Sequence, residues 1–180
     1  KAQYLVFDYA PPPELMQKYD PVTNSPVEGM YILQTKKTIP ARSDLKPAGQ
    51  LPAVSEETYC LVDSVRTSRE KSLSPNSIRH IFKEKGTVLI GAWTADKNTG
   101  YFRNGITVEV NGVSIPHLYG YPRADVMASK NKNPDFYPCG LRIRISEEYL
   151  LDGRNTVIFR TSDGKPLYGM ELIFQEKQRR

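Results

Sequence analysis

The sequence contains few of the residues that carry most enzyme chemistry. Only two of its 180 residues are histidines, His80 and His117. It has no P-loop, dinucleotide-binding fingerprint, nucleophile elbow or zinc-protease motif. A Cys–His nucleophile would require a cysteine beside one of these histidines, and no two carboxylates are marked out as a glycosidase pair. We therefore expect no catalytic residue and no enzymatic activity.

Long apolar runs are also missing. A transmembrane helix needs about 20 consecutive apolar residues, and no segment approaches that length, so we expect no membrane span. No signal-peptide pattern is visible, and the chain begins with Lys1 rather than Met. We interpret the chain as either a mature secreted protein or a segment of a longer polypeptide.

The net charge of +5 is not concentrated in one part of the chain. Residues 1–90 contain 12 Lys and Arg against 10 acidic residues, and residues 91–180 contain 13 against 10. A nucleic-acid-binding protein usually gathers its basic residues on one face or one helix. We therefore expect no nucleic-acid partner.

Cysteine is scarce, with only Cys60 and Cys139 present. Their spacing matches no metal site. Two interpretations remain open at this point. The pair forms one long-range disulfide if the compartment is oxidising, or each cysteine is a small buried hydrophobic residue with a free thiol.

Short alternating strand patterns dominate what is present. Strands are expected within residues 3–9, 30–39, 58–65, 87–93, 106–115, 141–145, 155–161 and 166–174. Within 106–115, Asn111 and Gly112 are typical of a two-residue hairpin turn. The pattern predicts a mainly β fold, an antiparallel β-sandwich of immunoglobulin-like or jelly-roll-like type, with one or two short helices.

One segment carries helix signals. Ser74 is a good N-cap, Pro75 suits the first helical position, and Ile78, Ile81 and Phe82 share one helical face. These features predict a short helix over residues 74–86. A second helical turn is expected after Ser146.

Five motifs follow one another in the second half of the chain. They are "GAWTAD" (91–96), "VEVNGV" (108–113), "YGYPRADV" (119–126), "CGLRIRI" (139–145) and "LLDGRNTVIFRTSDGK" (150–165). Their order and spacing resemble a family of bacterial β-sandwich modules found in surface and polysaccharide-associated proteins. The resemblance covers about half of the chain, and it implies an extracytoplasmic location: secreted, periplasmic or at the cell surface.

The resemblance also implies a division of the chain and a set of structural residues. Residues 86–176 would form the sandwich core module. Residues 1–85 would supply Pro-rich N-terminal strands, an arm and the short helix, packed on the same sandwich. The residues expected to maintain the fold rather than bind a ligand are Trp93, Gly120, Pro122, Arg123 and Asp125.

Aromatic residues gather in the loops between Ala95 and Pro138. Aromatic rings pack on the flat C–H faces of sugars, while neighbouring polar groups bond the hydroxyls. The candidate ligand-binding residues are Tyr101, Arg103, Tyr119, Tyr121, Asn133 and Tyr137. The alternative is that the aromatic side chains close the end of the core.

These observations favour a non-catalytic carbohydrate-binding or polysaccharide-associated module within a larger polypeptide or complex. The alternative is a structural or protein–protein interaction domain, immunoglobulin-like, of a bacterial cell-envelope or secreted assembly.

A structural calcium ion is one further hypothesis. Asp96 and Asn98 have the i, i+2 spacing of a calcium loop, but the twelfth position of such a loop is Thr107 rather than Glu. The alternative is a turn stabilised by the Asp96 side chain. No other cofactor or metal site is expected.

Overall fold

The computed structural model describes residues 4–7, 19–21, 31–35, 41–46, 49–53, 56–74 and 77–175. The chain forms two compact units, Lys1–Ile39 and Pro40–Arg180. In the first unit, β1 (Tyr4–Phe7), β3 (Tyr31–Thr35) and β2 (Tyr19–Pro21) form an antiparallel sheet in that order. The strands predicted within 3–9 and 30–39 are confirmed, while most of the predicted Pro-rich arm lies outside the described residues.

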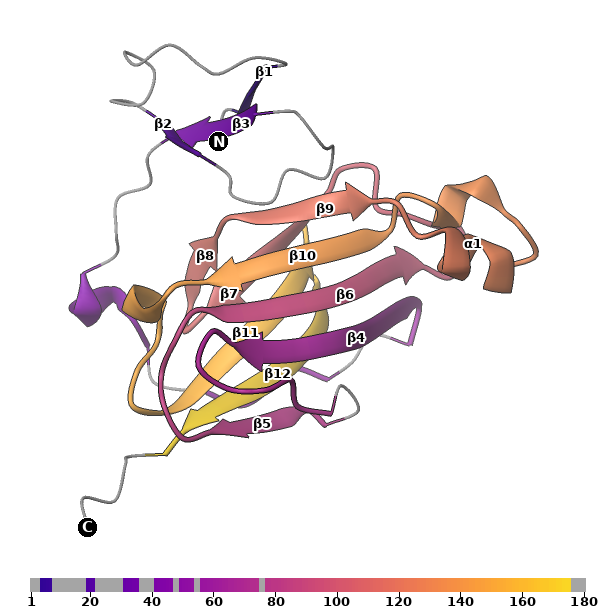
Figure 1. The fold of residues 1–180 in the computed structure, drawn as a ribbon. Helices are drawn as coiled ribbons and strands as arrows, with labels where there is room; N and C mark the ends of the chain where they lie inside the picture. Colours follow the sequence, from indigo (N-terminus) through magenta and orange to yellow (C-terminus); the bar gives the residue numbers. More distant parts are fainter. Residues whose placement is uncertain are drawn as a thin grey trace. The chain divides into compact units, whose positions relative to one another are not determined.

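The second unit contains two sheets (Figure 1). The four-stranded sheet has the order β4 (Thr58–Thr67), β6 (Val88–Asp96), β10 (Gly140–Ile145) and β9 (His117–Tyr121). The five-stranded sheet has the order β5 (Arg79–Phe82), β12 (Pro166–Phe174), β11 (Gly153–Thr161), β7 (Ile106–Val110) and β8 (Val113–Ile115). β4 and β5 precede residue 86 and are nevertheless strands of these two sheets.

One buried cluster draws its side chains from both sheets. Ile90 and Ile143 of the four-stranded sheet belong to it, as do Val108, Phe159 and Leu172 of the five-stranded sheet. β7 and most of β10 alternate buried residues with more exposed ones, as expected for strands with one face in a core. The predicted mainly β fold is therefore confirmed. β5 and β12 pair in parallel, so the five-stranded sheet is mixed rather than wholly antiparallel.

The predicted helix over residues 74–86 was wrong, because residues 79–82 form the strand β5. Burial in β5 alternates, with His80 and Phe82 inside and Arg79 and Ile81 outside. Two of the three residues on the predicted helical face, Ile78 and Ile81, are 58% and 46% exposed. Pairing with β12 outweighed the local helix signals, because apolar spacings of three and four also occur by chance in a short strand.

The hairpin predicted at Asn111–Gly112 is confirmed. Both residues have positive φ, 52° and 79°, as a type I′ turn requires. Asn111 is fully buried: its Nδ2 donates to the Asn155 Oδ1 (2.7 Å) and to the Tyr149 carbonyl (2.9 Å), and its Oδ1 accepts from the Thr156 N–H (3.1 Å). The turn between β7 and β8 is thereby bonded to the start of β11.

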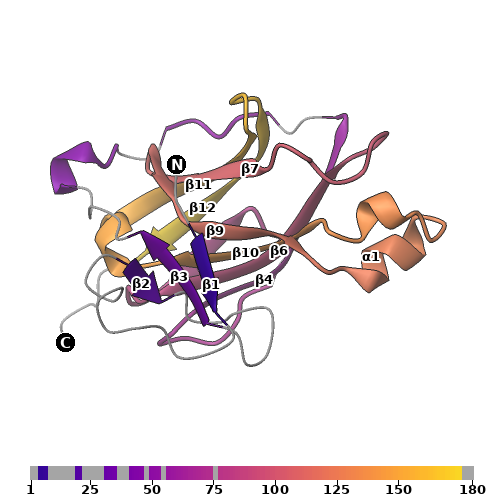
Figure 2. The same cartoon turned by 90° about the horizontal axis from the view of Figure 1, so that it is seen from above.

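The remaining helical pieces are short. They are η2 (Arg42–Asp44), α1 (Ala124–Ser129), η3 (Pro134–Phe136) and η4 (Glu147–Tyr149). The turn predicted after Ser146 is η4. α1 and η3 lie at one end of the four-stranded sheet (Figure 2), where Val126 and Phe136 pack with Ala95 and Cys139 in a second small core. No helix in the described ranges is long and apolar enough to cross a membrane.

Candidate ligand-binding face

The six predicted ligand-binding residues do not form one site. Tyr119 packs against the main core, and its hydroxyl donates to the Thr94 carbonyl (3.0 Å) and accepts from the Phe102 N–H (2.9 Å). Burial raises the pKa of this hydroxyl above its ordinary value. Tyr119 therefore connects β9 to β6 and to the loop before β7.

Four of the six lie around α1 and η3. Tyr101 packs against the second small core, and the Arg103 guanidinium lies 5.9 Å from its ring and 3.7 Å from the Asp135 carboxylate. The Asn133 side chain caps η3 by accepting from the Asp135 N–H. Tyr137 is 41% exposed. The sixth residue, Tyr121, lies on β9 with the Arg142 guanidinium 3.9 Å from its ring centroid.

The predicted structural motif contains a guanidinium fork. Arg123 donates to both carboxylate oxygens of Asp125 (2.8 and 2.7 Å) and to Asp63 of β4 (2.6 Å). These bonds lower the pKa of Asp125 to about 2 and raise that of Arg123. The Arg123 side chain also passes over Gly140, where a Cβ would approach its Cγ to 3.1 Å. The fork connects the start of α1 to the opposite edge strand of the sheet.

The other motif residues have separate roles. Gly120 has a φ of 95°, at the point where the pairing of β9 with β10 shifts register. Pro122 is exposed between β9 and α1. The Trp93 ring packs against the second small core, with the Tyr59 ring 6.0 Å away.

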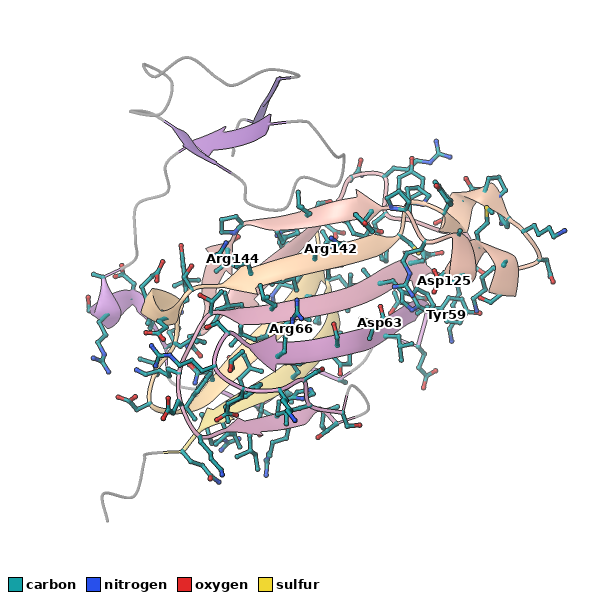
Figure 3. All side chains as sticks on the ribbon, in the orientation of Figure 1. Tyr59, Asp63, Arg66, Asp125, Arg142 and Arg144 are labelled. Carbon is teal, nitrogen blue, oxygen red and sulfur yellow. The ribbon has the colours of Figure 1, made fainter. Side chains whose placement is uncertain are left out.

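The outer face of the four-stranded sheet carries three arginines (Figure 3). Strand register groups its residues into three rows: Arg66, Leu89 and Arg144; Ser64, Gly91, Arg142 and Leu118; Leu61, Trp93, Gly140 and Tyr121. We call these rows the outer face. No residue in them is acidic. The two nearby aspartates, Asp63 and Asp125, are both bound by Arg123.

A β-bulge turns Arg66 outward. Val62 pairs with Ala92 and Ser64 pairs with Gly91, so Asp63 is an extra residue in β4. With strict alternation from Val62, Arg66 would face the core. The sequence gives no sign of this bulge. Arg142 and Arg144, by contrast, alternate with buried residues in "GLRIRI", and their shared face was predictable from that spacing alone.

Gly91 contributes no side chain in the middle of the outer face. A Cβ at this position would meet only the Ser64 hydroxyl, at 2.9 Å. Leu61, in the next row, is 47% exposed. The Ser64 hydroxyl therefore occupies the space where a side chain at Gly91 would stand.

The two cysteines carry free thiols. Cys60 pairs with Thr94 on one side of β6, and the Cys139 carbonyl accepts from the Thr94 N–H on the other side. Two strand spacings separate them by about 10 Å, beyond the roughly 7 Å that a disulfide tolerates between Cα atoms. Burial raises the pKa of Cys60 to about 12 and that of Cys139 to about 11. The free-thiol interpretation is the one that holds.

The predicted calcium position contains a side-chain-stabilised turn. The Asp96 Oδ1 accepts from the N–H groups of Asn98 (2.8 Å) and Thr99 (2.9 Å), and these bonds lower the pKa of Asp96. Among the described residues, no group of three or more His, Cys, Asp and Glu side chains is arranged to hold a metal ion.

Both histidines lie within the fold. The ring nitrogens of His117 lie 3.1 Å from the main-chain carbonyl oxygens of Ile115 and Ile106. His80 is buried in β5.

Comparison with known proteins adds no relative. No protein-family model matches the chain, and neither the curated proteins nor the solved structures contain a significant match.

Proposed function

We propose that this protein is a non-catalytic module that binds a polysaccharide on the outer face of its four-stranded sheet. The observation that carries the proposal is the combination, on one sheet face, of an apolar and aromatic row with a neighbouring row that places the Ser64 hydroxyl over Gly91. The motifs shared with polysaccharide-associated β-sandwich modules support the same function, and they support an extracytoplasmic location.

The chemistry of the face suits a sugar chain. Leu61, Trp93 and Tyr121 offer apolar surface for the C–H faces of a pyranose ring. The Ser64 hydroxyl and the Arg142 guanidinium lie in the next row and can bond ring hydroxyls. At Gly91 the nearest side-chain atom is the Ser64 hydroxyl oxygen, so a ring at this position meets a hydrogen-bonding group. This arrangement needs no nucleophile or general acid, in agreement with the proposed absence of catalysis.

Trp93 makes the proposal directly testable, because it is the only tryptophan in the chain. Titration with a panel of bacterial polysaccharides should change its fluorescence in a saturable way. Gly91→Val should weaken binding at least tenfold, because the new side chain displaces the Ser64 hydroxyl from the face while a β-branched residue suits a strand. Thr107→Val, on the outer face of the five-stranded sheet, is the matched control and should bind as the wild type does.

Two results would contradict the proposal. One is the absence of any fluorescence response to the whole panel. The other is undiminished binding by a folded Gly91→Val variant.

The alternative function, protein–protein interaction, is favoured by a different surface. β5 is an edge strand of the five-stranded sheet, and Ile78 and Ile81 are exposed there. An exposed edge with apolar side chains can pair with a strand of another protein. Loss of a protein partner in an Ile81→Lys variant that still binds polysaccharide would show that the two surfaces act separately.

A further inference from the structure

We propose that the free edge of β5 binds an extended peptide segment in which an apolar residue has an acidic residue two positions away on either side. The segment adds a strand to the five-stranded sheet, next to β5. This site is separate from the outer face and does not depend on polysaccharide binding.

The backbone of β5 has one side bonded to the sheet and one side directed away from it. β5 is the border strand of the five-stranded sheet, and its only neighbour in that sheet is β12 (Figure 1). The Phe82 carbonyl faces β12, where it accepts from the Gln175 N–H (2.8 Å). Alternate residues of a strand direct their backbone groups to opposite sides. The backbone N–H and C=O groups of Arg79, Ile81 and Lys83 therefore point away from the sheet.

Two side chains bond the ends of this edge. The Ser77 hydroxyl donates to the Arg79 carbonyl (2.6 Å) and lies 3.2 Å from the Arg79 N–H, from which it accepts. The Glu70 carboxylate accepts from the Lys83 N–H (2.7 Å). Between these two caps, the outward N–H and C=O of Ile81 bond no residue that the structure describes. The edge is thus capped at both ends and open in the middle.

The border strand β4 of the other sheet is covered differently. The Leu73 N–H donates to the Val65 carbonyl of β4 (2.9 Å), and the Ser72 hydroxyl donates to the same carbonyl (3.3 Å). That cover includes backbone, so the chain itself must move to expose β4. The caps on β5 are side chains alone, and they leave when their rotamers change. A partner strand can therefore replace both caps on β5 with its own backbone groups.

The side chain of Ile81 supplies an apolar contact at the open position. The residues on either side of it in β5, His80 and Phe82, are buried, so Ile81 faces outward and is 46% exposed. An apolar residue directly opposite on an added strand would pack against it. Apolar surface and free backbone groups on one edge are the features that favour pairing with another chain.

The neighbours of Ile81 on the same side of β5 are positively charged. Arg79 shares the Glu171 carboxylate with Arg154, so these three side chains have a net charge of +1, and Arg79 remains 57% exposed. Lys83 makes no ion pair with any residue that the structure describes. Opposite charges across a pair of strands attract and like charges repel. A second copy of β5, paired antiparallel about Ile81, would set Arg79 against Lys83, whereas an acidic–apolar–acidic strand complements both.

The test titrates the full chain with three synthetic peptides, "TETVTET", its basic counterpart "TKTVTKT", and "TETPTET", whose central proline lacks the N–H donor. Amide NMR gives the dissociation constants, and hydrogen exchange reports the protection of the Ile81 N–H. Ile81→Pro removes that N–H at an edge position, where a strand tolerates proline. Lys83→Glu reverses one charge, and Ser77→Ala removes one cap. Lys132→Glu, in the loop after α1, is the matched control for charge reversal at an exposed residue.

The expected result is saturable binding of "TETVTET" with slower hydrogen exchange at the Ile81 N–H, and no binding of "TETPTET". Ile81→Pro should weaken binding about tenfold. Lys83→Glu should weaken it about fivefold and make "TKTVTKT" the tighter ligand. Ser77→Ala should bind about threefold more tightly, because the peptide no longer has to displace that cap. Lys132→Glu should bind as the wild type does, and circular dichroism checks that every variant is folded.

Three outcomes would overturn the inference. If a folded Ile81→Pro variant binds "TETVTET" as the wild type does, the peptide does not pair with this edge. If "TKTVTKT" binds the wild type as tightly as "TETVTET", the partner is not acidic. If neither peptide binds, the edge is not a peptide site. Each outcome leaves the polysaccharide proposal standing, because that titration examines the outer face.

Discussion

At the scale of single residues, His80 is the clearest case of a polar group enclosed by the fold. Its side chain is 1% exposed, and neither ring nitrogen has a hydrogen-bond partner among the described residues. Burial lowers the pKa of His80, an effect that the nearby Ser77 backbone only partly offsets. The folded protein therefore favours the neutral imidazole, whereas the unfolded chain takes up a proton near pH 6.5.

This difference predicts a pH-dependent stability. Above about pH 6.5 the imidazole is neutral in both states and adds no pH dependence to the free energy of unfolding. As pH falls below that value, only the unfolded chain binds the proton, so the free energy of unfolding should decrease by up to about 1.4 kcal/mol per pH unit. Urea unfolding at pH 7.5 and 5.5 measures the effect. In His80→Leu the difference between the two pH values should shrink, and an identical difference in both proteins would contradict the argument.

At the scale of secondary-structure elements, β4 shows the effect of one extra residue. The bulge at Asp63 keeps Val62, Val65 and Thr67 in the core while Ser64 and Arg66 face outward. Deleting Asp63 should leave all five residues on their present faces. The deletion also removes one carboxylate bound by Arg123, a partly exposed pair, so we expect a loss of only about 1 kcal/mol in stability.

Deleting Val65 instead gives a matched comparison. This change also shortens β4 by one residue, but it removes a fully buried side chain. The loss should be about 3 kcal/mol, measured for both deletions by chemical unfolding. Equal losses would show that the bulge is as important to the fold as the buried valine.

The elements also show which features local sequence patterns reveal. The Asn111–Gly112 turn was predictable because a type I′ turn requires positive φ at both positions, and few residue pairs adopt it. The strand β5 was not predictable, because in a segment of four residues the spacing of apolar side chains cannot distinguish a strand from a helix. Arg142 and Arg144 could be assigned to one face from alternation. Arg66 could not be assigned to that face from alternation, because the bulge that turns it outward depends on pairing with β6.

The loop aromatics show the same limit. Tyr119 and Tyr121 are two residues apart on β9, yet one packs into the core and the other lies under Arg142. The register shift between β9 and β10 separates their environments. The positions of the two tyrosines in "YGYPRADV" could not reveal their different environments, because the difference results from contacts with β6 and β10.

At the scale of the whole molecule, the described core belongs to the second unit. The buried side chains run from Leu45 to Phe174, and both sheets of that unit are complete within Pro40–Arg180. We expect a fragment of residues 40–175 to fold alone, with the thermal midpoint and Trp93 emission of the full chain. An unfolded fragment by circular dichroism would show that residues 1–39 are needed for this core. Polysaccharide titration of the folded fragment would show whether they affect the outer face.

The buried hairpin turn also affects the rate at which the stored protein deamidates. Asn followed by Gly is the pair most prone to deamidation, because the glycine nitrogen can attack the asparagine side chain. In the folded protein both side-chain atoms of Asn111 are fixed by hydrogen bonds to β11 and to the Tyr149 carbonyl. Attack therefore requires the hairpin to open. Deamidation at Asn111, read by mass spectrometry on stored protein, would act as a chemical record of the time that the turn has spent unfolded.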